Sequence, residues 1–247
     1  ADNIIGGANF TNDYSANFTN YQDNNGHGTH VAGIIASNNK VHSIGVAPSS
    51  KLLILKALSY SGGGSVTSVI RALYYAASWR GANNEGVDIV CLSLGTPKDN
   101  PLLKEAIQYL ITKNILVVVA SGNDGDGSEV EEYRYPGFYN EVIQVGSIEK
   151  EMVPAYYSNN NKEIDLVAPG SAIFSTFINN GYRTLSGTSM AAPFVAGALA
   201  LLKEQGLLLF NRSLSESEMY GQLVKSTNFL SDYVAFMGNG VLDLSKA

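Results

Sequence analysis

Several features that define other protein classes are scarce or absent in this sequence. There is one cysteine, Cys91, so no internal disulfide bond can form, and a lone thiol suits a reducing compartment. The 16 basic residues are outnumbered by 22 acidic ones, which leaves a net charge of −6 and no basic surface of the kind that holds phosphate backbones. No apolar run reaches the ~18 residues that span a bilayer, and no basic stretch followed by an apolar run opens the chain. We therefore expect no nucleic-acid partner, no membrane partner and no export signal in the chain as given.

Nucleotide-binding motifs are absent as well. The glycine-containing segments GGANF and SYSGGGSV lack both the G-x-G-x-x-G and the G-x-x-x-x-G-K-[ST] spacing. No internal repeat, linker or low-complexity tract divides the 247 residues, of which 45% are hydrophobic and 15% are charged. These observations predict one globular domain over residues 1–247 and argue against a nucleotide-binding protein.

What the sequence does have is an alternation of short apolar runs and longer amphipathic stretches, which is typical of βαβ units on a parallel sheet. The short runs are rich in β-branched residues and bounded by turn residues, as strands buried on both faces are. The expected strands are 51–57, 87–92, 115–120, 142–145, 163–167 and 173–176. The expected helices are 65–79, 101–113, the apolar part of 185–205, and a last helix signalled by the capping-box spacing of Ser215 and Glu218. The fold class is therefore α/β, with a mostly parallel sheet flanked by helices.

Three polar residues occur where such folds place chemistry. His27 has a glycine on either side, Ser189 precedes an apolar helix, and Asn123 follows a buried strand. Each has an ordinary structural interpretation, as a capping or core histidine, an N-cap serine and a turn asparagine. Each also has a chemical one, because a hydroxyl nucleophile needs a neighbouring base and a side-chain amide can stabilise the oxyanion of acyl transfer. Loops at the carboxyl ends of parallel strands bring such groups together from distant parts of a chain.

Four motifs give these residues a common context. The stretches HGTHVAG, SLG, SGN and GTSMAAP, in this order, resemble the subtilisin family, and the resemblance covers essentially the whole chain. The stretches NIIGGANFT, YNEVIQVGSI and NKEIDLVAPG are most similar to its intracellular branch. The resemblance implies a three-layer fold and a serine endopeptidase that works through an acyl-enzyme. In that enzyme His27 would be the general base, Ser189 the nucleophile, and Asn123 the oxyanion donor together with the Ser189 backbone N–H.

The resemblance also implies where a polypeptide substrate binds. An extended peptide would pair as a strand between two segments, which are Gly62, Gly63 and Gly64 on one side and Ser93, Leu94 and Gly95 on the other. Glycine permits the close approach of one backbone to another, although the three glycines alone indicate only a flexible loop. The walls of the main specificity pocket would be Ala120, Ser121 and Gly122. The resemblance further implies that no cofactor is required, that the protein is cytoplasmic and that it forms a homodimer.

The sequence departs from the family at the catalytic aspartate. The family carries it in a D-T-G or D-S-G turn after an apolar strand, and neither turn occurs in the 247 residues. Asp2 falls too late to match, and Asp23 matches an aspartate of the substrate rim, so no triad aspartate is assigned. We expect a domain truncated at its N-terminus that lacks its first central strand, and either a separate N-terminal fragment that carries the aspartate or a truncated gene.

Activity of the isolated chain should then be weak, because loss of this carboxylate alone costs about 10⁴-fold in rate in a subtilisin and a chymotrypsin-like enzyme, from which the figure is borrowed. The alternative function is a pseudoprotease that binds extended peptides without cleaving them.

Two further departures concern charge. Arg134 resembles a residue on the floor of the specificity pocket, and we expect it to favour acidic or polar side chains unless Asp124 or a nearby glutamate neutralises it. The alternative is an arginine turned to solvent. The loop 37–45 looks one residue shorter than its family counterpart, which makes the family's tight calcium site doubtful. Glu163 and Asp165 either hold a weakly bound calcium or sodium ion or are two solvated acids.

Overall fold

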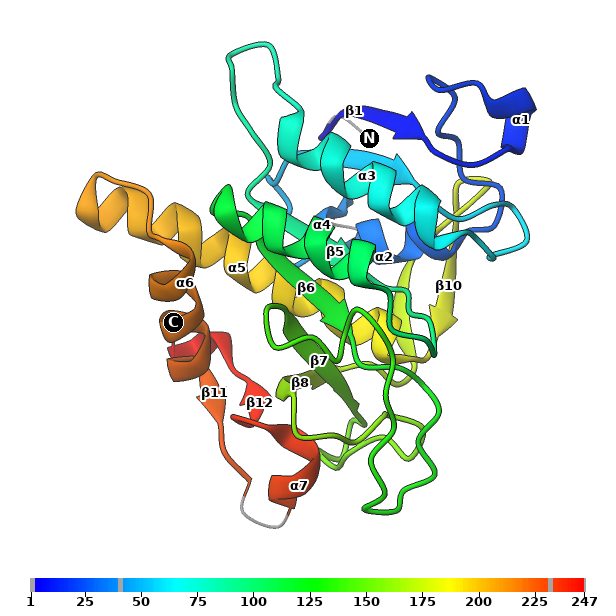
Figure 1. Ribbon diagram of the computed structural model, residues 1–247. Helices are drawn as coiled ribbons and strands as arrows, with labels where there is room; N and C mark the ends of the chain where they lie inside the picture. Colours follow the sequence, from blue (N-terminus) through cyan, green and yellow to red (C-terminus); the bar gives the residue numbers. More distant parts are fainter. Residues whose placement is uncertain (1–2, 40–41, 231–232, 247) are drawn as a thin grey trace.

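The computed structural model describes residues 3–39, 42–230 and 233–246, and it has three layers, with helices on both faces of a mainly parallel sheet (Figure 1). The main sheet has the strand order β11-β12-β8-β7-β6-β5. Its strands are β5 (Ile89–Leu92), β6 (Leu116–Ala120), β7 (Ile143–Ile148), β8 (Ile164–Pro169), β12 (Val241–Leu242) and β11 (Thr227–Asn228). All neighbours are parallel except β11, which pairs antiparallel with β12. Every residue of β6 and β7 is buried, as expected for strands covered on both faces.

The parallel sheet is interrupted beside β5. β1 (Ile4–Asn9) and β4 (Leu52–Lys56) form a separate parallel pair, and within the described ranges no strand joins this pair to β5. The two parts still share one core, because Ala8 and Ala57 belong to the same buried cluster as Leu92. Most residues of β4 and β5 are only half-buried, whereas β6 is fully buried. In the described part of the chain, β4 and β5 therefore each have one edge without a partner strand.

Helices cover both faces of the sheet. On one face α3 (Val66–Ser78) packs against α4 (Pro101–Thr112), which contacts β6. On the other face α2 (His27–Ala36) packs against α5 (Thr188–Phe210), which contacts β5, β6, β7 and β8. The remaining elements are the antiparallel hairpin of β9 (Ile173–Phe177) and β10 (Gly181–Leu185), α6 (Glu216–Lys225), and the short α1 (Asp13–Ala16), β2 (Asn38–Asn39), β3 (Ser43–Ile44), α7 (Val234–Met237) and a 3₁₀ turn (Leu244–Lys246). The hairpin packs against α2 through β9, and α2 in turn packs against α5.

α5 is the central helix of the domain. The side chains from Thr188 to Leu202 are mostly buried, and they form the cluster that fills one face of the sheet. Its most apolar window has a mean hydropathy of 1.4, so among the described helices it is the one whose length and composition would allow it to cross a membrane. This window is a mixed stretch of apolar, small and polar residues and not the unbroken apolar run of ~18 residues considered above. The contacts with four strands are those of a core helix.

Local sequence signals explain where the helices begin. Ser65 caps α3 by accepting a hydrogen bond from the Ser68 backbone N–H at 3.0 Å. Asn100 caps α4, and Pro101 occupies its first turn. The capping box predicted from Ser215 and Glu218 is confirmed at the start of α6.

Other expected boundaries needed revision. β1, β10 and α2 are not among the predicted elements, and α5 runs on to Phe210. Cys91 is half-buried against the core cluster on the α5 face of the sheet, and burial of its thiol raises its pKa to about 12.

A buried ion pair joins β4 to the first residue of α1. Lys56 Nζ lies 3.1 Å from Asp13 Oδ2, and their side chains are 7% and 10% exposed. Asp13 Oδ2 also accepts a hydrogen bond from the Tyr60 backbone N–H at 2.8 Å. Removing one partner of a buried pair leaves an uncompensated charge, whereas replacing both with apolar groups is often neutral.

We expect Asp13→Ala to lower the free energy of unfolding by about 3–5 kcal/mol and the double variant Asp13→Ala/Lys56→Met to recover most of this loss. Urea denaturation measures both changes. Lys162→Ala is the control, because it removes an exposed pair with Glu163 and should change stability by about 0–1 kcal/mol. Equal losses in the single and double variants would show that the buried charge is not the cause.

Candidate active site

A cavity of about 210 Å³ lies where β5 and β6 end and α5 begins. It is lined by Leu94, Gly95, Ala120, Gly122, Asn123, Asp124, Arg134, Thr188 and Ser189. Seven of these nine residues were named as site residues from the sequence: the nucleophile, the oxyanion donor, Arg134 and four residues of the substrate groove. The cavity thus gathers groups that are up to 95 positions apart in the chain (from 94 to 189).

Ser189 is the second residue of α5 and is half-buried. Its hydroxyl lies 3.4 Å from the carbonyl oxygen of Ser93, and the Ser93 hydroxyl donates to the Ser189 carbonyl oxygen at 2.7 Å. Gly187, the N-cap, has φ +150°, a value that side-chain-bearing residues rarely adopt. The hydroxyl groups of Ser93 and Ser189 thus link the start of α5 to the segment that follows β5.

Asn123 is held in one orientation by α5. Its Oδ1 accepts hydrogen bonds from the Thr188 backbone N–H at 2.8 Å and from the Thr188 hydroxyl at 3.0 Å. The Thr188 hydroxyl also accepts from the Gly122 N–H at 3.1 Å. Because Oδ1 is committed to these donors, the amide group of Asn123 presents Nδ2 as its free donor in the described structure. Thr188 was missed in the sequence analysis, although its place beside Ser189 in GTSMAAP was visible.

His27 is the first residue of α2. The turn before it is built around Asp23, whose carboxylate accepts from the Gly26 and Thr29 backbone N–H groups, both at 2.9 Å. Burial lowers the pKa of His27 below 6.5, the charge of His30 lowers it further, and the charge of Asp23 acts in the opposite direction. In the described structure, no hydrogen bond joins the His27 ring to Ser189.

His30 has a structural role instead. It is fully buried, and its Nε2 lies 3.1 Å from the Ile173 carbonyl oxygen and 2.9 Å from that of Arg183. Of the two histidines in HGTHVAG, His27 is thus the one with a free ring. Asp23 does not take the place of a triad aspartate, because its oxygens bind the backbone of the turn and the Thr29 hydroxyl.

The two predicted rims of the substrate groove differ in exposure and bonding. Ser93, Leu94 and Gly95 follow β5 at the open edge of the six-stranded sheet, and the next residue, Thr96, pairs with Tyr135. Gly62, Gly63 and Gly64 lie in an exposed turn between β4 and α3, where the Gly63 carbonyl oxygen accepts from the Ser59 N–H at 2.8 Å. Ser121, predicted as a pocket wall, is fully buried and does not line the cavity.

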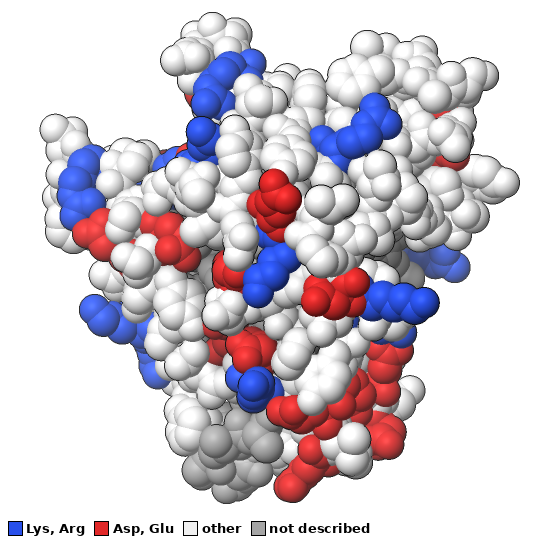
Figure 2. All heavy atoms as spheres, in the orientation of Figure 1, with Lys and Arg blue, Asp and Glu red and all other residues white. Residues whose placement is uncertain are grey.

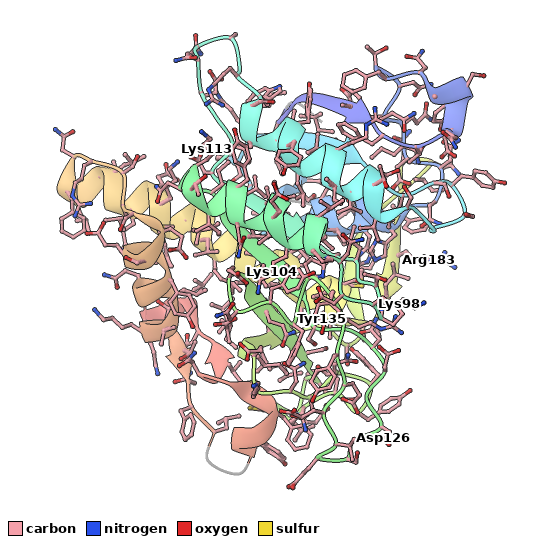
Figure 3. The ribbon with its side chains drawn as sticks, in the orientation of Figure 1. Lys98, Lys104, Lys113, Asp126, Tyr135 and Arg183 are labelled. Carbon is pink, nitrogen blue, oxygen red and sulfur yellow. The ribbon has the colours of Figure 1, made fainter. Side chains whose placement is uncertain are left out.

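Arg134 lines the cavity and is neutralised there. Its Nε and Nη2 donate to Asp124 Oδ2 and Oδ1 at 2.5 and 2.6 Å, a bidentate pair. Figure 2 shows acidic side chains gathered on the lower right of the molecule, in the region where Figure 3 labels Asp126. The sequence predicted that Arg134 would favour acidic or polar side chains unless Asp124 or a nearby glutamate neutralised it. The structure shows that Asp124 does neutralise it.

Asp165, one of the two residues proposed for a weakly bound cation, has both carboxylate oxygens engaged in hydrogen bonds. Asp165 Oδ2 accepts from the Gln144 backbone N–H at 2.7 Å, and Oδ1 accepts from the Tyr220 hydroxyl at 2.6 Å. Burial raises the pKa of Asp165 to about 6. No cluster of three or more His, Cys, Asp or Glu side chains in the described ranges could hold a metal ion. In the loop 37–45, Lys40 and Val41 lie outside the described residues.

Comparisons with known proteins give this geometry a family. A family model described as the subtilase family matches residues 6–236. The chain is 47% identical over 244 residues to an intracellular serine protease of Paenibacillus polymyxa, covering 98% of this chain and 73% of that protein. It is 49% identical over 245 residues to the major intracellular serine protease of Bacillus subtilis (98% and 75%) and 34% identical to subtilisin DY of Bacillus licheniformis over 245 residues (99% and 84%). The chain therefore belongs to the subtilase family, and it is a serine endopeptidase.

Proposed function

We propose that the chain hydrolyses peptide bonds in unfolded or flexible polypeptides, with Ser189 as nucleophile and His27 as general base. The observation that carries the proposal is the cavity that Ser189 shares with Asn123, whose amide orientation is fixed by Thr188. In the first step Ser189 Oγ attacks the carbonyl carbon, His27 takes the hydroxyl proton and passes it to the leaving amine, and an acyl-enzyme forms. Water then releases the acyl group by the reverse sequence of proton transfers. Side chains, backbone and water perform every step, so the proposal requires no cofactor.

The oxyanion would be stabilised by two donors. Asn123 Nδ2 is the side-chain donor, and the Ser189 backbone N–H, in the first turn of α5, is the second. A helix N-terminus adds its partial positive charge to that position.

The packing of α2 against α5 supports the pairing of His27 with Ser189. Val46 lies between the two helices: its N–H donates to the Ile34 carbonyl oxygen at 2.9 Å, and a Cβ at Gly197 would lie 2.7 Å from its own Cβ. Ile34 is seven residues after His27, and Gly197 is eight residues after Ser189. The contact at Val46 is thus about two helical turns from the start of each helix. If the two helices run in the same direction, His27 and Ser189 lie at the same end of the sheet.

The open sheet supports a second part of the proposal. An extended segment that carries the catalytic aspartate, such as a separate N-terminal fragment, would insert between β4 and β5, whose edges share one core. Inserted there, it would complete a single domain and orient the His27 imidazole.

By analogy with the relatives named as intracellular proteases, we also propose a cytoplasmic location. The homodimer expected from the resemblance remains part of this proposal.

A fluorophosphonate probe, which phosphonylates activated serines, tests the nucleophile. Labelling should be slow in the chain alone and should be lost in Ser189→Ala. Ser186→Ala is the matched control, since the Ser186 hydroxyl only accepts from the Ala172 N–H and labelling should persist. Persistent labelling in Ser189→Ala would reject Ser189 as the nucleophile.

The same assay tests strand insertion. A synthetic peptide with an apolar β-branched stretch ending in Asp-Ser-Gly should raise the labelling rate by at least about tenfold, because loss of the orienting aspartate costs far more in other serine proteases. A peptide with Asn in place of Asp should bind without this gain. Equal rates with both peptides would contradict the proposed role of the segment, and absence of labelling under every condition would favour the pseudoprotease that only binds peptides.

The lowered pKa of His27 predicts the pH dependence of labelling. Neutral imidazole is the form that accepts the Ser189 proton, and burial keeps the ring neutral below pH 6.5. The acid limb of the labelling rate should therefore have its midpoint below pH 6.5. Asp23→Asn should move this midpoint further down, because it removes the charge that raises the pKa. Asp126→Asn is the control: Asp126 is exposed and its charge does not act on His27, so this substitution should leave the midpoint unchanged. A midpoint at or above pH 6.5 in the unaltered chain would contradict the assignment of His27 as the general base.

A further inference from the structure

The cavity contains an ion pair that the reaction itself does not use. Arg134 and Asp124 both line it, with Nε–Oδ2 and Nη2–Oδ1 distances of 2.5 and 2.6 Å. The two side chains are 30% and 41% exposed, so the pair is partly hydrated and remains accessible to a bound side chain. A cavity of about 210 Å³ holds several times the ~30 Å³ that one water occupies, which leaves room for a long side chain beside the pair.

The position of Arg134 is set by two glycines. A Cβ at Gly95 would lie 3.3 Å from Arg134 Cβ, and a Cβ at Gly122 would lie 2.7 Å from Arg134 Cγ. The stem of the arginine therefore packs between the two walls of the cavity. Its neighbour Tyr135, labelled in Figure 3, exchanges two backbone hydrogen bonds of 2.8 Å with Thr96. Arg134 is thus a fixed part of the cavity rather than an arginine turned to solvent.

Asp124 is fixed as well. Its backbone N–H donates to Asn159 Oδ1 at 2.6 Å, and Asn159 is 1% exposed. The hydrogen bond from Arg134 holds the pKa of Asp124 below its ordinary value, so the carboxylate stays ionised at neutral pH. Two other acids of this segment have different partners, since Glu131 accepts from the Lys162 N–H and Glu132 from the Asn160 N–H. Within the described part of the chain, Asp124 is the carboxylate in ion-pair contact with Arg134.

We propose that Asp124 determines specificity: by neutralising Arg134, it makes the cavity select a long neutral side chain ending in a carboxamide and reject an acidic one. This inference rests on the proposed function, in which the cavity receives the side chain on the acyl side of the cut bond. A guanidinium has five N–H donors, of which Asp124 takes two, and the carboxylate keeps lone pairs free. A carboxamide supplies an acceptor for the first group and a donor for the second.

Charged side chains fit this pair less well. A carboxylate is attracted by Arg134 but repelled by Asp124 at almost the same distance, and it must give up its own hydration. An ammonium group is attracted by Asp124 but repelled by Arg134. Substituting Asp124 with a neutral residue removes one side of this balance and leaves an arginine with free donors, the arrangement that binds carboxylates bidentately. The same chain would then prefer glutamate to glutamine at this position.

Peptide binding to the full chain tests this without depending on turnover. In a Ser189→Ala background, which prevents cleavage, fluorescence anisotropy gives the Kd of labelled extended peptides that differ only in Gln, Glu, Lys or Leu at the relevant position. With Asp124 present, the Gln peptide should bind tightest. With Asp124→Asn, the ratio of the Glu Kd to the Gln Kd should fall by at least about tenfold, as expected for removal of a close like charge.

Controls separate the possible failures. Asp126→Asn removes an exposed charge from the same loop and should change the ratio by less than about twofold at 0.15 M salt, where distant charges are screened. Asp124→Ser provides a second variant if the asparagine disturbs folding, and the ratio between peptides is insensitive to the fraction folded. An unchanged ratio in both Asp124 variants would overturn the inference while leaving the groove intact. Failure of every peptide to bind would instead reject the proposed groove, and the inference with it.

Discussion

The structure depends on the burial of α5 against four parallel strands. Its small and branched side chains fill one face of the sheet, and this packing fixes the level at which the helix begins. Because the first turn then lies at the carboxyl ends of β5 and β6, Ser189 and Thr188 reach the loops that follow those strands. The hydrogen bonds from Thr188 to Asn123 convert a packing constraint into the orientation of a single amide group. In physical terms, the core determines the geometry of the site.

The interruption of the sheet also follows from how strands are paired and buried. A parallel strand is stable when it is paired on both edges and covered on both faces, and β6 and β7 meet both conditions. β5 and β4 do not, since each is paired on one edge and only half-buried. In the proposed function, a segment that pairs with these two edges would stabilise the domain and would bring the aspartate to His27.

Much of this was predictable from the sequence, and for identifiable reasons. β6 contains an unbroken run of three valines, so it begins within one residue of its expected bound, whereas β7 contains Gly146 and Ser147 and runs three residues past its expected end at Val145. The caps of α3, α4 and α6 are local signals carried by Ser65, Asn100 and Ser215, and they needed no tertiary information. His27, Ser189 and Asn123 were predicted as site residues because their motifs occur in a fixed order, not because any of the three is distinctive alone, and the structure brings Asn123 and Ser189 into one cavity.

What escaped prediction depends on contacts between distant segments. β1 contains two glycines and pairs only with β4, so its sequence gives a weak strand signal. Ser121 is fully buried and its N–H donates to the Val145 carbonyl oxygen, so its burial depends on a neighbouring strand that is distant in the sequence. Neutralisation of Arg134 was foreseen only as a condition, because the bidentate geometry with Asp124 arises from two glycines on separate loops. The saturation of Asp165 by Gln144 and Tyr220 likewise joins three separate elements.

We propose that Ser189, His27 and Asn123 act on one carbonyl group. A crystal structure of the chain after reaction with a peptidyl boronic acid, whose tetrahedral adduct mimics the oxyanion intermediate, tests this directly. We expect a bond from boron to Ser189 Oγ, with one boronate oxygen within hydrogen-bonding distance of Asn123 Nδ2 and the other within reach of the His27 ring. An adduct on another residue, or a His27 ring that stays beyond hydrogen-bonding distance of the adduct, would contradict it.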